Sequence, residues 1–152
     1  MKKLGLTILI LSCLAIQGCS DDDSNSNSNG NATAVANNLK SGTWKITNFS
    51  EDDVVETSNF QGYNFTFGTN NIIIATNGTN SYTGVWSVTD GNSGDDDNSS
   101  SDIDVNIAFT SPDAFTELTE DWDVSARTGV KIDLVHVSGG NGGTDHLTFE
   151  KN

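Results

Sequence analysis

The chain has 152 residues, enough for one ordinary domain, and 21 acidic residues against 7 Lys and Arg give a formal net charge of −14 at pH 7. So acidic a chain does not present the basic surface that phosphate contacts require, which excludes nucleic acid as a partner. Both cysteines, Cys13 and Cys19, lie near the N-terminus, so the rest of the chain must fold without a disulfide.

The first 18 residues have the pattern of a secretory signal. Two lysines follow Met1, and residues 4–16 are mostly Leu, Ile and Ala without a charge. A membrane-spanning helix would need ~20 apolar residues, and this run is shorter. A positive start, a short apolar run and a small residue before a cleavage point predict a signal peptide over residues 1–18.

Ile16, Gln17, Gly18 and Cys19 follow one another at the end of this run. They resemble the lipobox of bacterial lipoprotein signals, although Gln17 departs from the usual small residue. The resemblance implies cleavage before Cys19 and acylation of its thiol and its new amine, with palmitate among the acyl chains. One acyl chain binds a membrane only marginally, which agrees with the three chains that such anchors carry.

Residues 19–38 predict a disordered tether, because after the cysteine they hold one valine and no aromatic residue. The segment Ser20, Asp21, Asp22 and Asp23 resembles the export signal of surface lipoproteins from Bacteroidota-type bacteria. The resemblance implies that the protein is anchored in the outer membrane and faces the cell exterior. The alternative is that the triplet is only part of a solvated linker.

From Leu39 onward the sequence alternates between apolar and polar residues with a period of two, which predicts strands. Turn signals at Asn70-Asn71, Asn77-Gly78 and Thr128-Gly129 separate several of them. One segment, 112–118, begins with proline and predicts a short helix. The strands are centred on residues 44–46, 63–67, 72–74, 82–88, 103–109, 122–126, 132–134 and 147–149.

Eight such strands predict an all-β domain over residues 39–152, an antiparallel up-and-down barrel with one short helix. Closure into a barrel removes the exposed strand edges that favour aggregation. Trp44, Trp86 and Trp122 lie in phase with the apolar residues of their strands, so we expect them inside. We predict that they share one core with Phe65, Phe67, Ile107, Leu134 and Phe149.

Gly42 and Trp44 form the Gly-x-Trp opening of lipocalins, and the aromatic segments YNFTF, TGVWSV, FTEL, EDWDV and LTFEK follow in order. This series, from Leu39 to Lys151, resembles small lipocalin-like domains of secreted bacterial lipoproteins. The domain is shorter than an ordinary lipocalin. Arg127 is the remaining candidate for the arginine that lipocalins pack against the first tryptophan.

The sequence contains two candidate metal sites. If Leu134 faces Leu147 in the last hairpin, His136 faces Asp145 and His146 points the other way, so the two histidines cannot share an ion. The loop from Asp90 to Asp102 is rich in carboxylates but lacks the EF-hand spacing, so we expect a solvated hairpin loop. Weak calcium binding is the alternative, with the ligands Asp90, Asp95, Asp96 and Asp97.

No motif for catalysis is found, so we predict no cofactor and no enzyme activity. The sequence has no Gly-x-Ser-x-Gly elbow, and no Gly-Lys loop that would hold a phosphate. Asp121 and Asp123 lie on one face of a strand, but Trp122 between them is expected to point inward, so the pair should face solvent.

Two functions remain open. The first is a membrane-anchored, monomeric surface lipoprotein whose barrel binds a small apolar or amphipathic ligand, which rests on fold analogy. The second is a structural or interaction module, with a barrel filled by its own side chains and loops presented to a protein or glycan partner.

Overall fold

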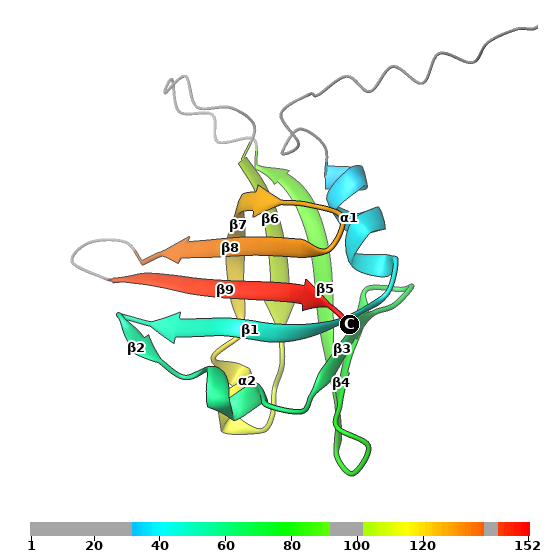
Figure 1. The fold of residues 1–152 in the computed structure, drawn as a ribbon. Coiled ribbons are helices and arrows are strands. Elements are labelled where there is room, and N and C mark those ends of the chain that lie inside the picture. The colour runs from blue at the N-terminus through cyan, green and yellow to red at the C-terminus, as the bar shows by residue number, and fades with distance from the viewer. Residues whose placement is uncertain (1–31, 92–101, 139–142) are drawn as a thin grey trace, which may run out of the picture.

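A computed structural model describes residues 32–91, 102–138 and 143–152 (Figure 1). The predicted signal, Cys19 and the segment Ser20–Asp23 lie outside the described residues. Within the described part, no helix is long and apolar enough to cross a membrane.

The elements are α1 (Ala32–Lys40), β1 (Thr43–Glu51), β2 (Val54–Val55), the 3-10 helix η1 (Thr57–Phe60), β3 (Asn64–Phe67), β4 (Ile72–Thr76), β5 (Ser81–Gly91), β6 (Asp102–Ala108), α2 (Asp113–Thr116), β7 (Glu120–Arg127), β8 (Lys131–Val137) and β9 (Thr144–Lys151).

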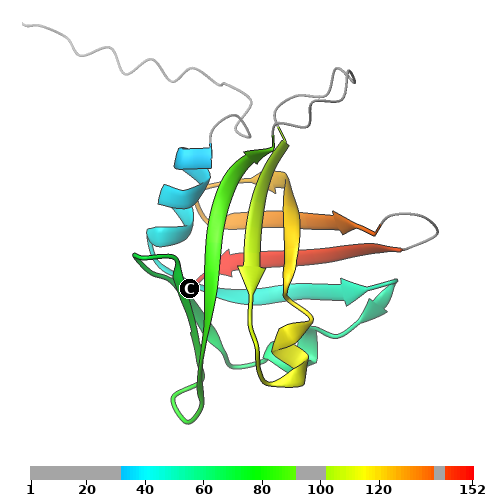
Figure 2. The ribbon, with the colours of Figure 1, turned by 180° about the vertical axis from the view of Figure 1, so that it is seen from behind.

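The strands form one antiparallel sheet that closes on itself. From β3 to β9 each strand pairs with the next along the chain, and β1 pairs with both β3 and β9. The short β2 pairs antiparallel with the last two residues of β1, Ser50 and Glu51. The result is a closed eight-stranded up-and-down barrel, which confirms the predicted fold class. Figures 1 and 2 show β5, β6 and β7 running across the direction of β1, β8 and β9 on the opposite wall.

The period-two alternation puts one face of each strand inside the barrel. In β3, Phe65 and Phe67 are buried while Asn64 and Thr66 are exposed. Every one of the eight side chains predicted to share the core is buried in a single cluster: Trp44, Trp86, Trp122, Phe65, Phe67, Ile107, Leu134 and Phe149.

The turns form where the sequence predicts them. Asn70 and Asn71, between β3 and β4, both adopt positive φ, at 57° and 60°. Asparagine tolerates this left-handed conformation better than other residues with a side chain. Gly78, between β4 and β5, has φ of 86°, which glycine adopts without steric cost.

The folded part begins earlier than the sequence analysis expects. Residues 32–38, assigned there to the tether, belong to helix α1, so the start of the domain at Leu39 was wrong. Val35 and Leu39 are both fully buried in the core cluster. Residues four apart lie on one face of a helix, so these two side chains form its apolar side.

Helix α1 closes one end of the barrel. The main-chain N–H of Ala32 donates to Asp90 Oδ1 (3.2 Å), near the end of β5. Six residues along, Asn38 Nδ2 donates to the carbonyl of Gly129 (3.1 Å), in the turn between β7 and β8. The helix therefore spans from one wall to the other, at the end where β1 begins and β9 ends.

The opposite end is covered by η1 and α2. Helix α2 lies within the predicted helical segment 112–118 and is only four residues long. It buries Phe115, and η1 buries Phe60; the two rings meet edge to face with centroids 5.3 Å apart. We call the two ends of the barrel the α1 end and the α2 end.

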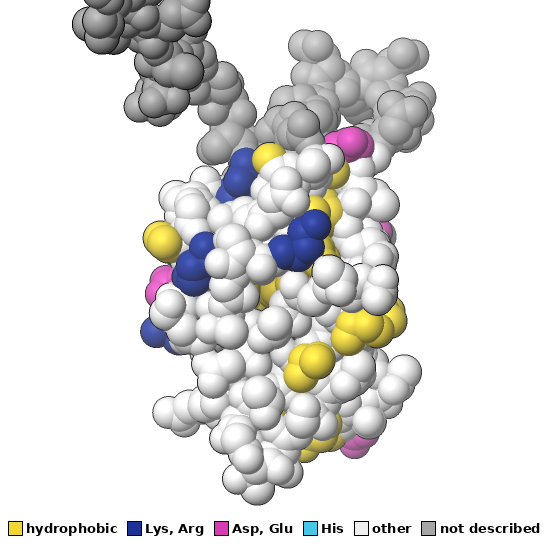
Figure 3. Space-filling model, turned by 90° about the vertical axis from the view of Figure 1, so that its right-hand side faces the viewer, with side chains coloured by type: hydrophobic (Ala, Val, Ile, Leu, Met, Phe, Trp, Pro, Cys, Tyr) yellow, Lys and Arg dark blue, Asp and Glu magenta, His cyan; other side chains and the backbone are white. Residues whose placement is uncertain are grey.

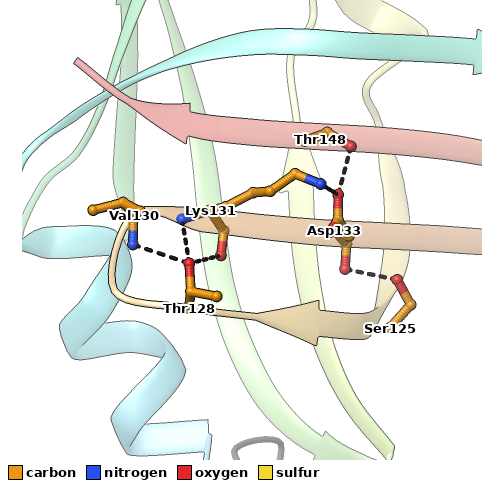
Figure 4. A network of polar contacts seen from close by, with 6 residues as sticks. All are labelled: Ser125, Thr128, Val130, Lys131, Asp133 and Thr148. Carbon is orange, nitrogen blue, oxygen red and sulfur yellow. Dashed lines mark hydrogen bonds and ion pairs between the residues drawn. The ribbon is translucent and has the colours of Figure 1, made fainter.

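One strand departs from the expected alternation. Trp122 and Val124 of β7 are buried as predicted, but Ala126, expected on the same face, is exposed. The register of β7 with β8 shifts between Val124 and Ala126, as it does at a β-bulge. Figure 4 shows Ser125 at this bulge, where its Oγ donates to the carbonyl of Asp133 (2.9 Å).

The neighbouring turn is held by side-chain contacts (Figure 4). Thr128 Oγ1 accepts the main-chain N–H groups of Lys131 (3.0 Å) and Val130 (3.3 Å). Asp133 Oδ1 accepts from Thr148 Oγ1 (2.8 Å) and lies 2.9 Å from Lys131 Nζ. These contacts fix the β7–β8 hairpin, on which the placement of His136 depends.

Candidate functional site

Aromatic side chains fill the barrel interior. Phe149 meets Phe65 and Phe67 edge to face, with centroids 5.5 and 5.4 Å apart. Phe65 also stacks on Phe115 of α2 at 6.0 Å, and Phe67 meets Trp86 at 5.2 Å. These rings run from the α2 end to the wall beneath α1, so the chain's own side chains occupy the barrel interior.

The motif residues Gly42 and Trp44 lie at the α1 end. The Trp44 ring is fully buried, and its Nε1 donates to the carbonyl of Leu39 in α1 (2.8 Å). The ammonium of Lys151 lies over the ring, 5.0 Å from its centroid. A side chain on residue 42 would meet the Lys151 stem at 3.2 Å, so glycine leaves room for this lysine. Lys151 is therefore a basic side chain packed on the first tryptophan, and the role of Arg127 stays a prediction.

A pocket of about 350 Å³ lies at the edge of the α1 end. Trp86 is 6% exposed and forms part of its wall, and its indole Nε1 donates to the carbonyl of Gly68 (3.1 Å). The remaining lining is mostly polar and comes from α1, the β3–β4 turn and β5: Ala36, Lys40, Gly68, Thr69, Asn70, Asn71, Ser87 and Val88. The sequence did not predict this pocket, because α1 was not expected.

Lysine and arginine side chains gather on this side of the molecule. Figure 3 shows several on the face that carries α1 and the C-terminus. Lys151 Nζ donates to Ser41 Oγ and to the carbonyl of Gly129, both at 2.9 Å. By their places in the strands and in α1, all lysines and arginines in the described residues lie toward the α1 end: Lys40, Lys45, Arg127, Lys131 and Lys151.

The proposed calcium ligands are only partly covered by the structure. Asp90 is exposed near the end of β5 and accepts the Ala32 N–H through Oδ1. Asp95, Asp96 and Asp97 lie outside the described residues, so weak calcium binding stays a prediction.

The register of the last hairpin agrees with the sequence analysis. Leu134 pairs with Leu147, and His136 pairs with Asp145. His146 is exposed, whereas the His136 side chain, on the neighbouring strand, is only 19% exposed. The two histidines therefore point to different faces of the sheet, as predicted.

His136 does meet two carboxylates that the sequence analysis did not connect with it. Its Nε2 lies 3.6 Å from Glu120 Oε2, and its Nδ1 lies 3.3 Å from Asp121 Oδ1. Nδ1 is also 3.0 Å from the Asp121 carbonyl, and the ring meets Trp122 edge to face at 6.2 Å. The bulge at Ser125 produces this arrangement, because an unbroken register would place His136 opposite Asp123 instead.

The electrostatic surroundings of His136 are negative. Burial lowers its pKa, but the Asp121 carbonyl and three carboxylates raise it by more, so the pKa lies above its ordinary value of 6.5. The three carboxylates belong to Glu120, Asp121 and Asp145. Asp121 and Asp123 are both exposed on β7 while Trp122 between them is buried, as expected.

Other carboxylates at the α2 end are also crowded. Burial first, and then the charge of Asp145, raises the pKa of Glu51 above its ordinary 4.5. Burial likewise raises the pKa of Glu117, followed by the charge of Glu56 and a side-chain hydrogen bond with it. This end of the barrel therefore has a negative potential that a bound cation would relieve.

Comparison with known proteins adds no relative: no protein-family model, no curated protein and no solved structure matches this chain. The resemblance to lipocalin-like domains therefore stays a prediction from the motif residues.

Proposed function

We propose that the chain is a lipid-anchored, non-catalytic binding module of the lipocalin-like type, and that its ligand is a small amphipathic molecule held in the pocket beside α1. The observation that carries this proposal is the pocket of about 350 Å³ next to Trp86. Its size is in the range of small-molecule sites, which are concave and combine an aromatic wall with a few polar groups. The filled interior favours this location over a central calyx.

The lining suggests the chemistry of the ligand. Trp86 and Val88 offer apolar surface, while Thr69 and Ser87 offer hydroxyls and Lys40 offers an ammonium. An apolar portion would pack against the ring and the valine, and an acidic or hydroxylated head would reach the lysine and the hydroxyls. An amphipathic ligand with a short chain fits both parts better than a purely apolar one.

Native mass spectrometry tests this directly. Protein purified from its own membranes under mild conditions is expected to carry a retained small molecule of defined mass. Ser87→Phe would fill the pocket and should abolish the added mass, whereas Ser81→Phe, at the exposed start of the same strand, should leave it unchanged. Equal retention by wild type and both variants would place the ligand elsewhere and refute the pocket.

The anchor and the location rest on Cys19 and on Ser20–Asp23. Cys19→Ser should release the protein from the membrane fraction or leave the signal uncut. Protease added to intact cells should digest the domain if it faces the exterior of the outer membrane. A processed Cys19→Ser protein that still partitions into membranes would contradict the anchor, and full protection from protease would contradict the exterior location.

A second function is a module that binds a protein or glycan partner at the cell surface. Two observations favour it: the aromatic interior, and the exposed valines of β2, Val54 and Val55, which are 58% and 71% exposed. Such apolar side chains at the edge of a sheet are suited to contact with another surface. In that case the double variant Val54→Ser/Val55→Ser should capture less of the partner than the wild type does when the proteins are cross-linked on cells. Ser87→Phe should capture as much as the wild type.

A further inference from the structure

The strongest unassigned feature is the group formed by Glu120, Asp121 and His136 at the α2 end. One ligand atom from each residue lies within 4.8 Å of the others. Glu120 and Asp121 begin β7, where they pair with residues of β6, and His136 lies near the end of β8, where it pairs with Asp145 of β9. The group therefore sits on rigid elements rather than on a loop.

The histidine ring is already oriented for coordination. Its Nδ1 lies 3.0 Å from the Asp121 carbonyl, which can only accept, so Nδ1 carries the hydrogen. In the neutral ring Nε2 then keeps its lone pair, and it lies 3.6 Å from Glu120 Oε2. Metal-bound histidines are commonly held in this way, with the second ring nitrogen donating to a carbonyl or carboxylate.

The spacing suits a small cation. With metal–ligand bonds of ~2.0–2.2 Å, neighbouring ligands of a tetrahedral site lie roughly 3.4 Å apart. Nε2 of His136 and Oε2 of Glu120 are 3.6 Å apart, so they need to move little to share an ion. The side chains of Glu120 and Asp121 are 42% and 69% exposed, which leaves solvent access for entry and for a bound water.

We propose that Glu120, Asp121 and His136 form a binding site for a divalent transition cation such as Zn²⁺ or Cu²⁺. One nitrogen and two oxygen ligands favour these ions over Ca²⁺ and Mg²⁺, which take oxygen ligands. The two carboxylates balance the charge of the ion, and the further carboxylates of Glu51 and Asp145 add to the negative potential around it. The site is distinct from the pocket beside Trp86, which lies at the other end of the barrel.

Calorimetric titration of the full chain with ZnCl₂ tests the site. The wild type should bind one equivalent saturably. His136→Gln should weaken binding by more than the ~10–100-fold that loss of a second-shell partner costs, because it removes a ligand itself. His146→Gln, on the neighbouring strand, is the matched control and should bind like the wild type. Circular dichroism and thermal melting establish that each variant is folded.

A second pair of variants uses exposed positions, where folding is less affected. Asp121→Asn removes a carboxylate ligand but keeps the main-chain carbonyl, and should weaken Zn²⁺ binding. Asp123→Asn, two residues along β7 and also exposed, should not. If Asp121→Asn and Asp123→Asn weaken binding equally, the ion responds to general negative charge, and the proposed site is wrong.

Tryptophan fluorescence gives an independent measure of position. Cu²⁺ bound at His136 lies beside Trp122, whose ring centroid is 6.2 Å from that of the histidine. One equivalent of Cu²⁺ should therefore quench the emission, and in Trp122→Phe the quenching should fall markedly. Wild-type quenching in His136→Gln, or no saturable Zn²⁺ binding by the wild type, would overturn the proposal.

Discussion

The two ends of the barrel are closed in the same way but carry different charges. At the α1 end, the indole of Trp44 donates to the carbonyl of Leu39 in the covering helix (2.8 Å). At the α2 end, the indole of Trp122 donates to the carbonyl of Leu118, just beyond the covering helix (3.1 Å). In both cases a buried tryptophan ties a short helical segment to the barrel, and the covering segment contributes a buried leucine.

The two ends of the barrel differ in charge. Among the described residues, the lysines and arginines lie toward the α1 end, where Lys131 pairs with Asp133. At the α2 end the carboxylates face mostly one another, and among the described residues His136 and His146 are the side chains there that can carry a positive charge. Similar closure with different electrostatics suggests two separate roles: an organic ligand beside α1, and a cation beside α2.

The largest effect is expected from removing the tryptophans that hold the ends. Trp44→Ala and Trp122→Ala should each lower the free energy of unfolding by ~3–5 kcal/mol, because each removes a fully buried ring and leaves a cavity. Urea unfolding followed by circular dichroism measures both. If Trp44→Ala costs less than about 1 kcal/mol while Trp122→Ala costs the full amount, α1 is not a structural counterpart of α2.

A smaller effect tests whether α1 belongs to the folded domain. Val35→Ala should cost roughly 1–3 kcal/mol, because its side chain is completely buried in the core cluster. Asn37→Ala, exposed on the same helix, should have little effect. Equal stability of the two variants in urea would mean that residues 32–38 belong to the tether and that α1 does not close this end of the barrel.

The cation over Trp44 should contribute less. Lys151→Met keeps the apolar stem but removes the ammonium, with its cation–π contact to Trp44 and its hydrogen bonds to Ser41 and Gly129, so the expected loss is at least the ~0.5–1 kcal/mol of a partly exposed cation–π contact. Lys45→Met, exposed on β1, serves as the control and should be neutral. A neutral Lys151→Met would mean that Trp44 is held by burial and its hydrogen bond alone.

The smallest effect concerns the carboxylates of the α2 end. Glu117 has a raised pKa, so the folded state binds its proton more tightly than the unfolded state does. Its contribution to stability is present below pH 4.5 and is lost as the pH rises through the raised pKa. Glu117→Gln should therefore stabilise the protein at pH 7, by less than about 1 kcal/mol because the side chain is only half-buried. Thermal melts at pH 4 and pH 7 measure the stability of both proteins. A variant that is less stable than wild type at pH 7 would contradict the claim that the ionised Glu117 is destabilised by burial and by the charge of Glu56.

Much of the barrel could be predicted because strand periodicity is local. The alternation around Phe65 and Phe67 is visible in a few residues, and the pairing of Leu134 with Leu147 follows from which side chains must face inward. Helix α1 was missed because it follows a polar tract and has one apolar pair, Val35 and Leu39. That spacing of four was the signal available in the sequence.

The cluster around His136 could not be predicted in the same way. Its geometry depends on the bulge at Ser125, where one extra residue in β7 moves His136 from opposite Asp123 to opposite Trp122. The alternation predicts that Ala126 points into the barrel, but in the structure this residue is exposed. The pocket beside Trp86 was missed for a related reason, because α1 forms one of its walls.

The central claim is that the small ligand binds beside α1 and not inside the barrel. Nuclear magnetic resonance with ¹⁵N-labelled protein tests it most directly, with octanoate titrated as a short amphipathic probe. Amide shifts that saturate should cluster at residues 36–40, 68–71 and 86–88, which line the pocket. Saturable shifts centred instead on Phe65, Leu134 and Phe149, inside the barrel, would contradict the account and show that the core opens to admit a ligand.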